Sequence, residues 1–244
     1  MNKTIITNRI NIITSMLASL VLIGLVSTSH ATQPASAAKL TLQQLAEHPN
    51  RSAEHQQRNK YRNPTETLSF FGLAPHMSVL ELWPARGWYT EILAPFLKDQ
   101  GQLTIAHFRH NDGSLKDERQ IFWARLSQRL AQRMAEEIDW FGPVNQIELE
   151  PPFFIPTLAP EQFDMVLTFR NAPIWDERGH LLSTLQSIYD VLKPGGVLGM
   201  VEHRAAKLSE LTSSAVEGYL DEAYVIAAAL QVGFVLAGSS DINA

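Results

Sequence analysis

The chain has 244 residues, of which 45% are hydrophobic, enough for one α/β domain with a sizeable core. Its formal net charge of −5 leaves no basic excess to hold a phosphate backbone, which argues against a nucleic-acid partner. The sequence contains no cysteine, so disulfides, thiolate metal sites and a cysteine nucleophile are excluded.

The first 31 residues have the layout of a secretory signal. Lys3 and Arg9 precede an apolar stretch at residues 16–26, and the small-residue exit Ser29-His30-Ala31 follows. We therefore expect a signal peptide at 1–31, a linker at 32–39 and a periplasmic or secreted domain at 40–244. The alternatives are a second exit at Ala35-Ser36-Ala37 and an uncleaved segment, which would then be the chain's contact with a membrane.

The remaining chain alternates between predicted strands and helices. Short helices are expected at 40–46 and 51–60, and Asn63-Pro64-Thr65-Glu66 predicts a helix start capped by the Asn63 amide. Strands are then expected at 78–82, 102–107, 145–150, 163–168, 197–202 and 234–237. Helices are expected at 88–97, 115–137, 179–192 and 217–232. This alternation predicts a single Rossmann-like, doubly wound α/β domain with a mostly parallel sheet.

The second of these longer helices carries an apolar stripe at four-residue steps. We expect this stripe to face the core; its members are Phe122, Leu126, Leu130 and Met134.

The loop after the first sheet strand carries the strongest functional signal. It runs from Glu81 through Trp83 and Ala85 to Gly87, and then enters a helix. This stretch resembles the acidic-x-Gly-x-Gly-x-Gly motif of class I S-adenosyl-L-methionine (SAM)-dependent methyltransferases. Glu81 takes the acidic place and Gly87 the last glycine place, while Trp83 and Ala85 stand at the other two. The Gly-x-Gly-x-x-Gly pattern of nicotinamide enzymes is matched less well. A nicotinamide-dependent oxidoreductase is therefore only the third functional alternative, after a methyltransferase and a non-catalytic binding protein or scaffold.

Further segments resemble an exported group of predicted methyltransferases. These segments are Trp83 to Glu91, Phe169-Arg170-Asn171 with Trp175, Leu192 to Gly196, Glu202-His203-Arg204, Gly218 to Tyr224 and Asp241 to Ala244.

The resemblance implies SAM as the cofactor. It places around that cofactor Glu81, Trp83, Ala85, Arg86 and Gly87. Arg86 would either crowd the methionine part of SAM or meet its carboxylate. Trp83, standing at a glycine place, must protrude into the cleft or reshape it.

Neighbouring positions leave two further questions open. Trp88 and Tyr89 either face the sulfonium or pack as ordinary helix residues. The expected second strand ends without the carboxylate that class I enzymes usually offer to the ribose hydroxyls, and Asp112 is the nearest acid.

The ends of the fourth and fifth expected strands provide the catalytic candidates. Arg170 and Asn171 are predicted to position the substrate, although Arg170 could instead form an ion pair with Glu202. His203 is the preferred base, because the unperturbed pKa of histidine lies near neutrality; a structural histidine is the alternative. No metal is predicted, since His107 and His110 lack an obvious third ligand.

The leading functional prediction is a SAM-dependent methyltransferase acting on a small molecule or an envelope component. The rival is a non-catalytic, exported ligand-binding or scaffold protein with a degenerate methyltransferase fold. In the resembled architecture an antiparallel seventh strand inserts between the fifth and sixth strands, whereas the sequence reaches Ala244 just after the sixth predicted strand. We therefore expect a missing last strand, a truncated chain and marginal folding.

Overall fold

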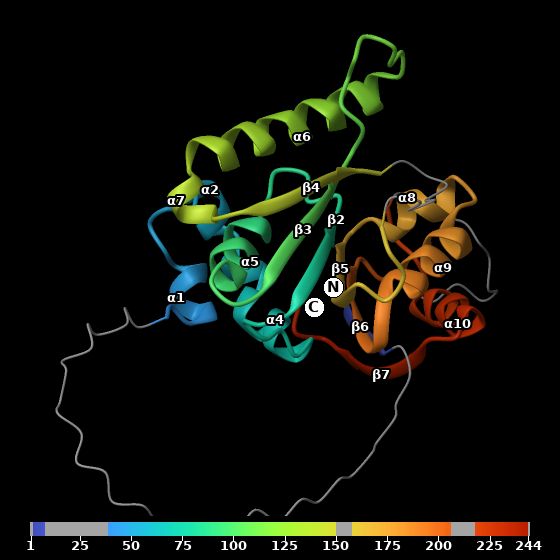
Figure 1. Ribbon diagram of the computed structural model, residues 1–244. Helices are drawn as coiled ribbons and strands as arrows, with labels where there is room; N and C mark the ends of the chain where they lie inside the picture. The colour runs from blue at the N-terminus through green and yellow to red at the C-terminus, as the bar shows by residue number, and fades with distance from the viewer. Residues whose placement is uncertain (1, 8–38, 150–157, 206–217, 244) are drawn as a thin grey trace, which may run out of the picture.

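The computed structural model describes residues 2–7, 39–149, 158–205 and 218–243. Its core is a seven-stranded sheet in the order β4-β3-β2-β5-β6-β1-β7 (Figure 1). The strands are β1 (Asn2–Thr7), β2 (Ser78–Leu82), β3 (Gln102–His107), β4 (Val144–Glu148), β5 (Phe163–Phe169), β6 (Leu192–Glu202) and β7 (Val235–Ser240). The five strands from β4 to β6 pair in parallel, which confirms the predicted Rossmann-like fold class.

Helices cover both faces of the sheet. They are α1 (Leu42–Ala46), α2 (Ala53–Gln57), α3 (Asn59–Arg62), α4 (Pro64–Phe70), α5 (Thr90–Leu97), α6 (Glu118–Glu136), α7 (Ile138–Phe141), α8 (Ala172–Glu177), α9 (Leu181–Val191) and α10 (Glu222–Val232). Helices α8, α9 and α10 lie on one side, and α1, α4 and α5 on the other (Figure 1). None of these described helices is long and apolar enough to cross a membrane.

Successive residues of the central strands pack into two separate hydrophobic cores, one on each face of the sheet. In β2, Val79 packs with the α1, α4 and α5 side, while Leu80 and Leu82 pack with the α8, α9 and α10 side. Both faces of a parallel sheet are covered, so every residue of β2 and β3 after the first is buried. That property explains why β2 and β3 have the bounds that the sequence predicts.

The position of the expected seventh strand is filled from the other end of the chain. β1 lies between β6 and β7 and runs antiparallel to both, with Thr4 opposite Met200 on one side and Ser239 on the other. Among the described residues no strand follows β7, and because β1 takes the position of the expected missing strand, the sheet has no gap there. Because β1 lies within the predicted signal peptide, cleavage after Ala31 would remove it. The apolar stretch at 16–26 and both exits lie outside the described residues.

The Asn63 cap prediction is wrong in its chemistry. Pro64 does begin α4, but Asn63 has a left-handed backbone (φ 37°) and its side chain makes no capping bond. Instead its amide donates to the carbonyl of Ile242 (2.6 Å) and to Asn243 Oδ1 (3.3 Å). Asn63 therefore connects the turn between α3 and α4 to residues near the end of the chain, a contact that a local pattern cannot reveal.

Candidate functional site

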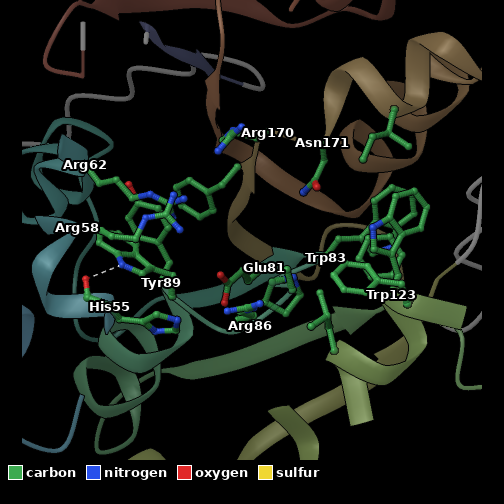
Figure 2. A pocket seen from close by; sticks show the side chains of 18 of the residues that line it. His55, Arg58, Arg62, Glu81, Trp83, Arg86, Tyr89, Trp123, Arg170 and Asn171 are labelled. Atoms are coloured by element: carbon green, nitrogen blue, oxygen red, sulfur yellow. Dashed lines mark hydrogen bonds between the residues drawn. The ribbon is translucent and has the colours of Figure 1, made fainter. Parts of the chain in front are cut away.

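A cleft of about 500 Å³ lies beyond the carboxyl ends of β2 and β5. This is where ligands bind in open α/β sheets, and the volume suits a small molecule. Among the predicted site residues, those that line it are Glu81, Trp83, Ala85, Arg86, Arg170 and Asn171. In Figure 2, Arg58 and Arg62 lie on one side of the pocket, Trp83 and Trp123 lie on the other, and Arg86 lies between them beside Glu81.

The loop after β2 has the backbone of a glycine-rich loop without most of its glycines. Trp83, Ala85 and Gly87, the three glycine places of the resembled motif, all have positive φ, of 45°, 52° and 76°. A left-handed backbone costs about 1–2 kcal/mol for a residue that has a Cβ. The conformation persists at Trp83 and Ala85 despite that cost, so the surrounding structure must impose it.

Trp83 reshapes the cleft instead of protruding into it. Its side chain is buried, its ring stacks on Phe108 with centroids 4.3 Å apart, and its indole N–H donates to the carbonyl of Leu149 at 3.0 Å. Phe108 in turn stacks on Trp123 at 4.7 Å. These rings form one aromatic wall of the cleft.

Arg86 does not seal the cleft. Its guanidinium forms an ion pair with Glu54 at 3.3 Å, and its side chain is 58% exposed. Gly87 is not among the described residues that line the cleft. Close packing explains why a glycine stands there, because a Cβ would lie 2.5 Å from Leu130 Cδ1. Of the five cofactor residues that the resemblance implies, four therefore reach the cleft and Gly87 supports the loop from behind.

Trp88 and Tyr89 are both buried and act in packing. The guanidinium groups of Arg51 and Arg62 both lie over the Trp88 ring, with their carbons 5.0 and 4.8 Å from ring centroids. Tyr89 stacks on Phe169 with centroids 3.6 Å apart. Both rings also line the cleft, where they form a second aromatic wall.

Asn171 ties the ends of two strands together at the base of the cleft. Its amide donates to the carbonyl of Leu82 at 3.0 Å and to Thr168 Oγ1 at 3.1 Å. Glu202 accepts from the backbone N–H groups of Asn171 and Ala172, each at 3.1 Å. Within the described chain Glu202 forms no ion pair with Arg170, so the structural ion-pair alternative is wrong.

His203 lies apart from this cleft. It lines a separate, small hollow with Glu202 and Leu220, and its ring packs against Tyr219 at a centroid distance of 5.1 Å. Burial, followed by the charge of Arg170, lowers its pKa. The structure does not bring His203 together with the cleft residues, and its role as a base stays a prediction.

The ribose carboxylate remains absent from the end of β3. Asp112 is exposed and engaged by Arg109 at 3.1 Å, and it does not line the cleft. His107 and His110 have ring centroids 5.9 Å apart. In the described part of the chain, no three histidine, aspartate or glutamate side chains gather as a metal site requires.

Glu81 is a buried carboxyl in the wall of the cleft. It is 1% exposed, and the Thr90 hydroxyl donates to it at 2.7 Å. Burial raises its pKa to about 8, with the Thr90 bond acting weakly in the opposite direction. Glu81 is therefore mostly protonated at neutral pH and adds little negative charge to the cleft.

The Glu81→Gln variant should lose part of the pH dependence of stability. Unfolded Glu81 ionises near 4.5, but folded Glu81 ionises near 8, so its contribution to stability falls as pH rises between those values. The difference in free energy of unfolding between the variant and the wild type should therefore shift in favour of the variant by on the order of 3 kcal/mol from pH 5 to pH 8.

Urea unfolding between pH 5 and pH 8.5 measures this effect. Glu136→Gln, on the exposed surface of α6, is the control and should keep the wild-type slope. Parallel stability curves for Glu81→Gln and the wild type would contradict a protonated Glu81.

The cleft also contains residues that the sequence analysis missed. Arg58 and Arg62, from the short helices before the sheet, line it beside Arg170. Phe122, which was expected in the core, is 52% exposed and lines the cleft, whereas Leu126, Leu130 and Met134 are buried as predicted. No local motif marks Arg58 or Arg62, since charged residues on short helices usually face water.

Comparisons with known proteins agree on the fold alone. No family model matches the sequence, and no curated protein matches it. The structure is similar to that of a SAM-dependent methyltransferase from Aquifex aeolicus, with a TM-score of 0.54 and 16% identity, covering 80% of this chain and 89% of that one. It is also similar to the [4+2]-cyclase SpnF, with a TM-score of 0.52 and 17% identity over 77% of this chain and 60% of that one.

A third similar structure is the carbon methyltransferase CurJ. Its TM-score is 0.52 at 14% identity, covering 76% of this chain and 49% of that chain. The protein therefore has the fold found in SAM-dependent methyltransferases, with a ligand-sized cleft at the position where this class of sheet binds ligands.

Proposed function

We propose that the protein is a SAM-dependent methyltransferase that acts on a small acceptor. The observation that carries this proposal is the left-handed backbone at all three glycine places of the loop beside an open cleft. The similarity to methyltransferase structures supports it at the level of fold. Export to the periplasm or beyond, and an envelope acceptor, are finer proposals that depend on the sequence of residues 1–31.

The cleft fits a cofactor of this kind. Its volume of about 500 Å³ suits a small-molecule ligand, and the Arg86 side chain is turned to Glu54 at the rim. The two aromatic walls offer flat apolar surfaces for a planar base and π-faces for a cation. Trp83, Ala85 and Arg86 would hold the cofactor along the loop, with Glu81 behind them.

When bound, SAM supplies an electrophilic methyl group. The chain's own contribution to such a reaction is orientation, because an in-line displacement requires well-aligned reactants. Asn171 fixes the relative position of the β2 and β5 ends, and Trp83 and Tyr89 keep the walls rigid through their stacked partners. Two titratable side chains among the described residues that line the cleft are Glu81 and His55. Of these, His55 is already engaged, because its Nδ1 lies 3.0 Å from Glu91.

One observation favours the rival, a non-catalytic ligand-binding protein or scaffold. The carboxylate for the ribose hydroxyls is missing at the end of β3, because Asp112 is exposed and paired with Arg109. The similarity to SpnF, a cyclase by name, also shows that this fold is compatible with other chemistry.

Calorimetric titration of the full chain with SAM and its demethylated product S-adenosylhomocysteine separates the two functions. We expect binding of both, because the cleft is open and ligand-sized. Ala85→Leu should weaken binding at least tenfold, since it adds bulk where the loop meets the cleft.

Ala135→Leu, the same substitution on the exposed surface of α6, serves as the matched control and should bind as the wild type does. An absence of heat at millimolar ligand would overturn the methyltransferase proposal and favour the rival. A parallel titration with NADH tests the oxidoreductase alternative.

A further inference from the structure

Three arginines from two distant parts of the sequence converge on one side of the cleft. Arg58 caps the end of α2, Arg62 ends α3, and Arg170 follows β5 with a left-handed backbone (φ 67°). All three line the cleft, and Figure 2 shows them gathered opposite Trp83 and Trp123. The short helices α2 and α3 and the carboxyl end of β5 thus present one cationic surface, hereafter the arginine cluster.

The arginine cluster has no carboxylate partner within the described residues. Elsewhere in the same molecule guanidinium groups are paired: Arg51 with Glu91 at 3.2 Å, and Arg86 with Glu54 at 3.3 Å. The side chains of Arg58 and Arg170 make no hydrogen bond or ion pair in the described chain, and Arg62 only stacks on Trp88. A compact group of like charges without counter-ions is electrostatically costly.

The arginines influence one another and their surroundings. Burial, followed by the charge of Arg58, lowers the pKa of Arg62 to about 10, and the charge of Arg170 acts in the same direction. The pKa of His203 is also lowered, first by burial and then by Arg170. The charge of Arg170 therefore also acts on His203, which directly follows β6.

The acids of the cleft do not cancel this positive charge. Glu54 is engaged by Arg86, and Glu81 is protonated at neutral pH because burial raises its pKa to about 8. A single carboxylate, such as the one at the methionine end of SAM, can satisfy one guanidinium fork but not three. The arrangement calls for a ligand with several negative charges.

We propose that Arg58, Arg62 and Arg170 form a subsite for a small acceptor that carries a phosphate or clustered carboxylates, with at least two negative charges. That the ligand is a methyl acceptor depends on the proposed function, whereas the anion site itself depends only on the arginine cluster. The ligand is small because the cleft measures about 500 Å³. Guanidinium groups bind such anions with paired, charge-assisted hydrogen bonds.

Calorimetric titrations of the full chain at constant ionic strength test the subsite. The probes are inorganic pyrophosphate for phosphates and citrate for clustered carboxylates, with acetate as the singly charged comparison. We expect pyrophosphate or citrate to bind at least tenfold more tightly than acetate. Arg58→Gln, Arg62→Gln and Arg170→Gln should each weaken the tighter interaction at least fivefold.

Arg129→Gln is the matched control, because Arg129 lies exposed on α6 away from the cleft. Circular dichroism and urea unfolding of each variant identify loss of fold, and an Arg62→Lys variant, which keeps the charge, should retain part of the affinity.

S-adenosylhomocysteine titrations of the same variants distinguish the two proposals. Anion binding that is lost while S-adenosylhomocysteine binding is kept supports an acceptor subsite. Loss of S-adenosylhomocysteine binding in the arginine variants would mean that they hold the cofactor, which overturns the subsite. Failure of the wild type to bind either anion also overturns it. Anion binding without S-adenosylhomocysteine binding would support the anion site while overturning the methyltransferase function.

Discussion

Replacing Glu91 with glutamine should destabilise the protein by about 3 to 5 kcal/mol. Glu91 lies fully buried in the first turn of α5, where it accepts from Arg51 at 3.2 Å, lies 3.0 Å from His55 and bonds Arg133 of α6. Arg51 is itself buried, at 2% exposure. Glutamine would leave the Arg51 charge buried without its counter-ion, and this uncompensated charge is the source of the cost.

Urea unfolding at pH 7 measures the loss, and Glu177→Gln provides the control. Glu177 forms an ion pair with Arg119 at 3.6 Å, but both side chains are more than half exposed, so its replacement should change stability by less than about 1 kcal/mol. Equal losses in the two variants would show that burial of the Glu91 cluster is energetically unimportant.

The same cluster predicts sensitivity to acid. Burial acts to raise the pKa of Glu91, but the bonds from His55 and Arg133 outweigh it and lower the pKa below its ordinary value. A lowered folded-state pKa adds stability above the unfolded value and loses it as pH falls through the folded value. Glu91→Gln should therefore lose less stability than the wild type on acidification.

Placing proline at Thr4 should destabilise the sheet by about 3 kcal/mol or more. Thr4 lies mid-strand in β1 and pairs with both Met200 and Ser239, so each neighbour depends on its backbone. Proline lacks the N–H donor and is found in sheets essentially at edges and bulges; the register irregularity of β1 falls later, between Ile5 and Ile6.

Thr4→Val, which keeps a β-branched side chain and the backbone donor, should unfold within about 1 kcal/mol of the wild type. Hydrogen exchange gives the local readout: amides of β6 and β7 should exchange faster in Thr4→Pro. Unchanged exchange and unchanged unfolding in that variant would show that β1 is not a working strand of the sheet.

Local patterns predicted the central fold well and the long-range contacts poorly. β2 and β3 were predicted with the bounds observed, because a short, mostly apolar run between turn residues is a local signal. β1 was not predicted, since its residues lie within the predicted signal peptide and its partners lie at the far end of the sequence.

The candidate site shows the same division. The loop from Glu81 to Gly87 could be placed from its motif, and Arg170 and Asn171 from the end of a strand. Arg58 and Arg62 could not, because the buried pairing of Arg51 with Glu91 folds their helices over the cleft. For Trp83 the sequence left two alternatives open, that the ring reshapes the cleft or enters it, and the stack on Phe108 decides between them.

The position of β1 also sets an order of events during synthesis. β1 emerges from the ribosome before every other described element, whereas its partners β6 and β7 are among the last. The sheet can therefore close only after nearly all of the chain has been made. Until then the amino-terminal segment is available to any machinery that recognises it. If the chain is exported as proposed, translocation and sheet closure would therefore compete in time for the same residues.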